Sequence, residues 1–188
     1  MSNPKKASEQ SELFHSSHLM VLITLTLCTA LLIGESILMG WELFILPLIC
    51  VGVIICWVVH FRQDASPVFR VRIYGILMMC TAFFYGIHQT STFDLAIVMA
   101  MLIVLFTTTG MKELITMCQI TYYGTMAYNL SVMAYNGESF ETLAITRISL
   151  HLVLIFVVGW FSKLIIDRWM QVIANSQDEI VQLTEATE

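Results

Sequence analysis

Four polar side chains each lie near one end of a different apolar segment: Glu35, His88, Asn129 and His151. Polar groups are costly inside a bilayer, so such residues are functional candidates by default. A histidine titrates near neutral pH and a buried carboxyl group can retain its proton, so together they could bind a proton or a small ligand. The hypothesis is one shared cavity, open to the outside. The alternative is that each side chain reaches interfacial water separately.

Catalytic motifs are missing from the apolar segments. The string Gly34-Glu35-Ser36-Ile37-Leu38 comes nearest to a serine-nucleophile turn but lacks its second glycine, and H-E-x-x-H does not occur. The five cysteines are odd in number and contain no C-x-x-C, which disfavours a disulfide framework or a zinc site. The sequence therefore predicts no catalytic residue, no metal site and no cofactor.

The composition predicts a membrane protein. Hydrophobic residues make up 57% of the chain and charged residues 12%, far from the balance of a soluble domain. A bilayer core roughly 30 Å thick is crossed by about 20 residues of helix, and only helices can span at this composition. The expected fold is all-α, a six-transmembrane helical bundle. The segments are a tail at 1–18, spans at 19–38, 43–60, 73–90, 95–109, 114–135 and 148–166, and a connector helix at 167–188.

Two local features refine this outline. Pro47 lies within the second predicted span and is expected to kink it by removing a backbone donor. The stretch Glu138–Arg147 is expected to be the longest outer loop, too short for a sensor domain of its own.

The basic residues fix the expected orientation. Cationic flanks of spans are retained in the cytoplasm, and threading six spans places all but Arg147 on one side. Both termini are therefore expected in the cytoplasm, and no basic patch suggests nucleic acid as a partner. The cytoplasmic set is Lys5, Lys6, Arg62, Arg70, Arg72, Lys112, Lys163 and Arg168.

A heptad pattern continues the last span into the cytosol. Its a and d positions are spaced by three and four residues, and β-branched residues at a favour two parallel strands. The sequence predicts a homodimeric coiled coil here. An amphipathic surface helix would carry Lys and Arg on its polar face, which this segment does not; a monomeric or unstructured tail is the other alternative. The seam residues are Ile166, Trp169, Ile173, Ser176, Ile180 and Leu183.

This arrangement, with no domain-sized loop and an acidic helix leaving the last span, resembles the input region of bacterial sensor histidine kinases. The stretch at 175–186 is similar to the linker that precedes their phosphoacceptor helix. The family's phosphoacceptor and ATP-binding motifs are absent, so no family site residue is transferred.

The resemblance implies a sensor of a two-component system in the bacterial inner membrane. It would respond to a small extracellular or membrane-dissolved ligand and signal to an output domain beyond this chain, which is expected to be truncated. Diguanylate and adenylate cyclases with membrane domains share the same plan. A small transporter or channel is the remaining alternative. It is disfavoured because Pro47 is the only proline in a span and no ionisable residue lies at mid-membrane depth.

Overall fold

The chain forms six helices in the part that the computed structural model describes, residues 4–41, 44, 46–62, 66–88, 92–137 and 142–185. All regular structure within these ranges is helical, which confirms the predicted all-α class. The helices are α1 (Pro4–Met39), α2 (Leu46–Phe61), α3 (Pro67–His88), α4 (Thr92–Thr107), α5 (Lys112–Tyr135) and α6 (Thr142–Glu185).

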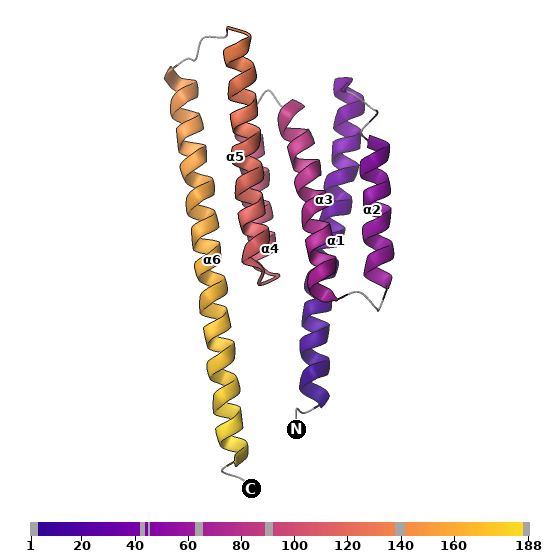
Figure 1. The fold of residues 1–188 in the computed structure, drawn as a ribbon, viewed down its shortest axis with the longest axis vertical. Coiled ribbons are helices and arrows are strands. Elements are labelled where there is room, and N and C mark those ends of the chain that lie inside the picture. Colours follow the sequence, from indigo (N-terminus) through magenta and orange to yellow (C-terminus); the bar gives the residue numbers. More distant parts are fainter. Residues whose placement is uncertain are drawn as a thin grey trace.

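The helices pack as two groups of three. α1, α2 and α3 contact one another, as do α4, α5 and α6, and α3 joins the groups by packing against α4 and α5. Successive helices alternate in direction, so the start of α1 and the end of α6 lie at the same end of the bundle (Figure 1). We call this the terminal end, and the opposite end, where α1 connects to α2 and α3 to α4, the far end.

Glycines on α3 allow it to lie close to its neighbours. A Cβ atom added to Gly75 would lie 2.5 Å from Cδ2 of Leu114 on α5, and one added to Gly86 would lie 2.5 Å from Cγ2 of Thr125. Small residues at such crossings let helix backbones approach, which is how helices associate where lipid removes the usual hydrophobic driving force. α3 is therefore positioned as the central helix of the bundle.

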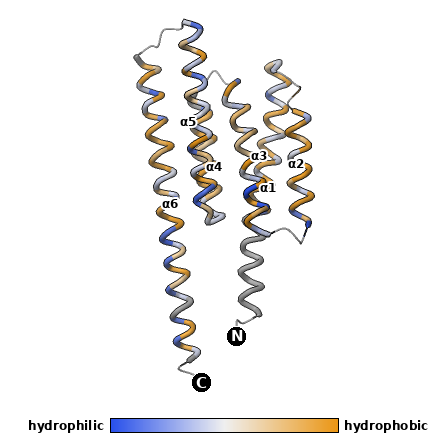
Figure 2. Tube along the Cα trace, viewed as in Figure 1, coloured by the Kyte–Doolittle hydropathy of each residue, from blue (hydrophilic) through white to orange (hydrophobic). Residues whose placement is uncertain are grey.

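Many large apolar side chains point away from the bundle. Leu31, Leu48, Met101 and Leu150 keep 74%, 72%, 68% and 64% of their surface exposed. Apolar residues run along the helices over most of the bundle's height (Figure 2). An apolar surface of this extent is typical of a protein surrounded by lipid or by partner helices.

Three helical stretches are long and apolar enough to cross a membrane: His18–Met39, Pro67–His88 and Leu143–Thr184. α2 and α4 are apolar but have only 16 residues each, about 24 Å of helix. α5 has 24 residues and carries more polar side chains. The structure is compatible with membrane insertion.

Two sequence expectations differ from the structure. Pro47 is the second residue of α2, where the missing N–H removes no helical hydrogen bond, so the kink predicted in the outer half of this span is wrong. α6 begins at Thr142, so much of the expected outer loop Glu138–Arg147 is helical.

Gly110, with φ of +70°, forms the tight turn between α4 and α5.

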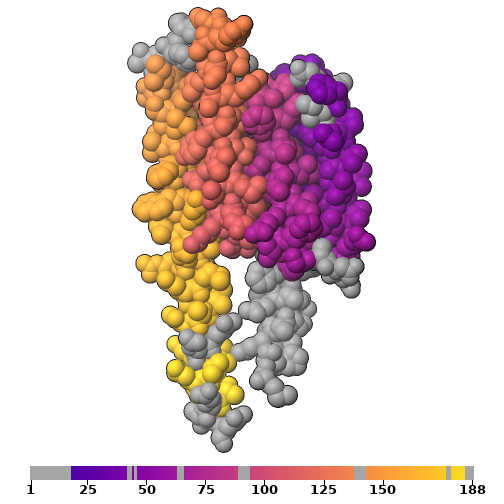
Figure 3. Space-filling model, viewed as in Figure 1, coloured from indigo at the N-terminus to yellow at the C-terminus, as the bar shows by residue number. Residues whose placement is uncertain are grey.

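α6 is a single helix of 44 residues, roughly 66 Å long. It passes Trp169 without a break, and its second half extends beyond the bundle (Figures 1 and 3). This confirms the predicted continuation of the last apolar segment as a helix.

Candidate functional site

A cavity of about 180 Å³ lies where α1, α3 and α4 meet, in the half of the bundle nearer the far end. It therefore sits between the two groups of three helices, beside the central helix α3. Ten residues line it: Cys28, Leu31, Leu32, Glu35, Met78, Thr81, Ala82, Tyr85, Val98 and Leu102.

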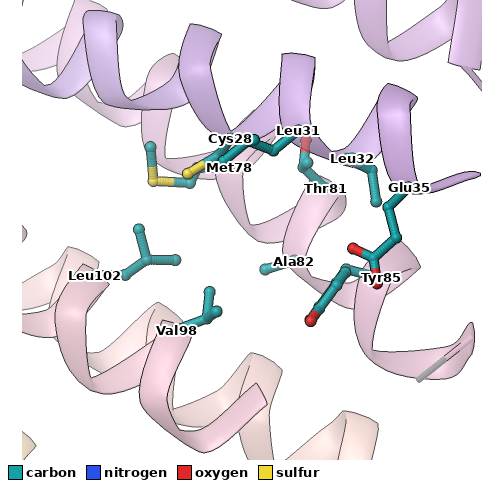
Figure 4. A pocket seen from close by; sticks show the side chains of 10 residues that line it. All are labelled: Cys28, Leu31, Leu32, Glu35, Met78, Thr81, Ala82, Tyr85, Val98 and Leu102. Atoms are coloured by element: carbon teal, nitrogen blue, oxygen red, sulfur yellow. The ribbon is translucent and has the colours of Figure 1, made fainter. Parts of the chain in front are cut away.

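The lining is apolar along most of its length and polar at one end. Glu35 from α1 and Tyr85 from α3 lie close together there and point their oxygen atoms toward the cavity (Figure 4). Cys28 and Met78 lie at the opposite end, and Val98 and Leu102 of α4 form the facing wall (Figure 4). The cavity could hold a small apolar group with one polar end.

Aromatic rings of α3 and of Trp41 pack together beside the polar end of the cavity. The ring of Trp41 lies 6.3 Å from that of Tyr85 and 5.0 Å from that of His88, in each case between centroids. Phe84 contacts the same rings, at 6.5 Å from Trp41 and 4.5 Å from His88. Such edge and tilted contacts stabilise a rigid cluster. Tyr85 contacts this cluster through the ring of Trp41.

The four residues proposed from the sequence lie in different surroundings, and only Glu35 lines the cavity. His88 is in the aromatic cluster, with Nδ1 2.8 Å from the carbonyl oxygen of Phe84. Asn129 on α5 donates to the carbonyl oxygen of Gly86 at 2.9 Å, joining α5 to the end of α3. His151 is buried on α6.

A second polar centre joins α5 to α6. Nε2 of Gln119 lies 3.3 Å from the carbonyl oxygen of Ile155 and 3.5 Å from that of Phe156, and Nζ of Lys163 donates to its Oε1 at 2.9 Å. Gly159 makes room for the amide, because an added Cβ atom would overlap Nε2 of Gln119. Gln119 is thereby satisfied in a buried place, where an unpaired amide would be costly.

Two ion pairs tie the helices at the terminal end. Arg72 of α3 contacts both carboxylate oxygens of Glu113 on α5, with Nε and Nη2 each 3.0 Å from one oxygen. Lys112, the neighbouring residue, pairs with Asp167 of α6. The two ion pairs therefore connect α3 to α5 and α5 to α6, at the point where α6 leaves the bundle.

The predicted seam changes surroundings along α6. Ile166 is 4% exposed and packs in the bundle, whereas Ile173 and Ile180 are 43% and 42% exposed in the single chain. Trp169, Ser176 and Leu183 are also exposed. The seam beyond Ile166 thus leaves apolar side chains in regular spacing on one side of a projecting helix.

The metal-ligating and thiol side chains are distributed as follows. Among the described residues, no three His, Cys, Asp or Glu side chains gather in a way that could hold a metal ion. All five cysteines are free thiols, of which Cys56 and Cys118 are buried.

The cavity residues Cys28 and Thr81 were not anticipated from the sequence, whereas Tyr85 lies at the depth of the four proposed residues and was expected beside them. A signal for them exists, because the lining positions on α1 are 28, 31, 32 and 35 and those on α3 are 78, 81, 82 and 85. Both sets follow the i, i+3, i+4, i+7 pattern of one helix face. The pattern shows that each helix has such a face, but not that the two faces meet.

Comparison with known proteins adds no relative. The chain matches no protein-family model, no curated protein and no solved structure.

Proposed function

We propose that the chain is the membrane-embedded input region of a dimeric bacterial signalling protein of the sensor histidine kinase type. The helices α1 to α6 would each cross the inner membrane, with both termini in the cytoplasm. α6 would carry the signal through a parallel coiled coil to an output domain beyond residue 188.

The distribution of charge supports this orientation. Arg62, Arg70, Arg72 and Lys112 lie at or near helix ends on the terminal end, toward which α6 also runs. Arg147 lies near the start of α6, at the far end. Retention of cationic flanks in the cytoplasm would place the terminal end inside the cell.

The projecting half of α6 is the observation that carries the proposal. An isolated helix of this length is marginal in water unless its apolar side is covered. Ile173, Ile180 and Leu183 keep that side apolar, and the a/d spacing matches a second copy of the same helix. The partner we propose is therefore a second copy of this chain.

The polar contacts of α6 suggest how a stimulus would reach the seam. A change near α3 would act on α5 through Arg72 and Glu113, and on α6 through Lys112 and Asp167. A packed seam has a few discrete arrangements, so a small shift of α6 can select between two states. The stimulus must favour one of these states over the other.

The test is disulfide crosslinking of the full chain in native membranes through Ser176→Cys, a d position of the seam. We expect a covalent dimer on mild oxidation. Adding Ile173→Asp and Ile180→Asp should abolish the dimer, because charges would be buried in the seam.

The matched control adds Gln171→Asp and Val181→Asp instead, which introduce the same two charges outside the a/d positions. We expect this control to crosslink normally. Efficient crosslinking of the seam double variant, or equal loss in both double variants, would contradict a dimer through this face.

A further inference from the structure

We infer that the cavity between α1, α3 and α4 binds a small hydrophobic amine, with its ammonium group at Glu35 and its apolar part along α3 and α4. This inference rests on the proposed sensory function for its biological meaning. Binding itself can be measured without any output.

The size of the cavity limits the ligand. A volume of about 180 Å³ is close to that of engineered protein cavities of about 150 Å³ that take up benzene. One aromatic ring or a short alkyl chain fills such a space. Leu32, Met78, Ala82 and Leu102 provide buried apolar contacts for it.

The charge at the polar end selects the sign of the ligand. Among the described residues that line the cavity, Glu35 supplies the one carboxylate and none is a lysine or arginine. Beside this half-buried carboxylate an anion would be repelled and an ammonium group attracted. The hydroxyl oxygen of Tyr85 lies at the same end and can accept a hydrogen bond from the ammonium group.

The way in is from the side of the bundle. Leu31 lines the cavity and is 74% exposed on the outer surface of α1, where lipid would lie in the proposed orientation. A hydrophobic amine partitions into a bilayer with its charge near the interface. It could therefore enter past Leu31 with the ammonium group facing the far end, where Glu35 lies.

The experiment measures binding of radiolabelled 2-phenylethylamine to the full chain in lipid nanodiscs. Two competitors have nearly the same shape: uncharged propylbenzene and anionic phenylacetate. We expect the amine to bind and the acid not to compete. Glu35→Gln should weaken amine binding by about tenfold or more, the effect of losing a charge-assisted contact, and should leave propylbenzene competition unchanged.

Asp94→Asn is the matched control, because it removes a carboxylate from the first turn of α4 that does not line the cavity. We expect unchanged binding in this variant. Val98→Phe should abolish binding by filling the cavity.

Alkylation locates the site without any substitution. Cys28 lines the cavity, whereas Cys80 on α3 is exposed and does not. We expect 2-phenylethylamine to slow the reaction of Cys28 with N-ethylmaleimide, followed by mass spectrometry, and to leave Cys80 unaffected.

Three results would overturn the inference: equal binding by wild type and Glu35→Gln, stronger competition by the acid than by propylbenzene, or no protection of Cys28. Each concerns binding alone. Such a failure would leave the crosslinking test of α6 untouched, and a failed crosslink would leave this binding intact.

Discussion

Gly159 and Gln119 show how one missing side chain fixes the contact between two helices. The Gln119 amide reaches two successive carbonyl groups of α6 only because Gly159 has no Cβ atom in the way. The ammonium group of Lys163 then donates a hydrogen bond to the carbonyl oxygen of the same amide. The contact therefore depends on both the size and the polarity of these residues.

Gly159→Ala should destabilise the bundle by roughly 1–3 kcal/mol, because the new methyl group displaces the Gln119 amide from its acceptors. Gln119→Ala added to it should recover part of the loss by removing the overlap. Unfolding of the purified chain by titration with SDS measures both. Gly34→Ala is the control, since an added Cβ atom there meets no atom within 4 Å. Equal effects of Gly159→Ala and Gly34→Ala would show that the overlap with the Gln119 amide is unimportant.

Asn129 offers a smaller effect of the same kind. Its amide donates to the carbonyl oxygen of Gly86, two residues before the last residue of α3, and so ties α5 to that end of the helix. Asn129→Leu should cost about 0.5–1 kcal/mol, the usual worth of a hydrogen bond between membrane helices. SDS titration again provides the measurement. A loss above about 2 kcal/mol would indicate that Asn129 has a further role beyond this bond.

Individual residues could be predicted only in part. Glu35 was identified because a carboxyl group is rare in an apolar segment, and it does line the cavity. Its neighbours Cys28, Thr81 and Ala82 are ordinary residues of apolar helices, and become significant only because α1 and α3 face each other. The pairing of Gln119 with Lys163 likewise depends on how two helices pack, which periodicity does not reveal.

At the scale of the element, the ion pairs at the terminal end join helices but contribute little to stability. The side chains of Arg72 and Glu113 are 50% and 62% exposed, and such pairs contribute at most about 1 kcal/mol. Their geometry is more informative than their energy, because each pair joins a different helix to α5.

Arg72→Glu should therefore lower stability only slightly, by about 1 kcal/mol or less, while changing the angle between α3 and α5. Distances between spin labels on the two helices would detect the change. Arg72→Glu combined with Glu113→Arg should restore the distance, because the pair is rebuilt with its charges exchanged. An unchanged distance in the single variant would show that this ion pair does not position α5.

Helix boundaries illustrate what local sequence can and cannot give. The continuity of α6 past Trp169 follows from the absence of Gly and Pro in its second half. Whether Pro47 kinks its helix could not be predicted, because the answer depends on where α2 begins. α2 begins at Leu46, and a proline in the first turn does not kink a helix. Helix starts are set by capping and tertiary contacts as much as by hydrophobicity.

At the scale of the whole molecule, the proposed orientation can be tested on intact cells. Arg147→Cys should react with a membrane-impermeant maleimide added outside, because α6 starts at the far end. Gln171→Cys should react only after the cells are permeabilised. Labelling of Gln171→Cys from outside would reverse the orientation, and labelling of neither position after permeabilisation would argue against exposure of both ends of α6.

The all-α class was predictable because composition and length leave few alternatives in a bilayer. The way in which the two groups of three helices join was not, because it depends on close approaches of α3 to α4 and α5 at Gly75 and Gly86. The cavity lies where α1, α3 and α4 meet, between these groups, and so lay beyond what the sequence alone could indicate.

The uninterrupted length of α6 has a mechanical consequence. Its second half contains no glycine or proline to absorb bending, so it behaves as a stiff lever pivoting near Asp167. With an arm of roughly 28 Å, a tilt of about 5° at the pivot would displace the tip by roughly 2–3 Å. Movements too small to disturb the packing around the pivot are thus enlarged where the rod ends.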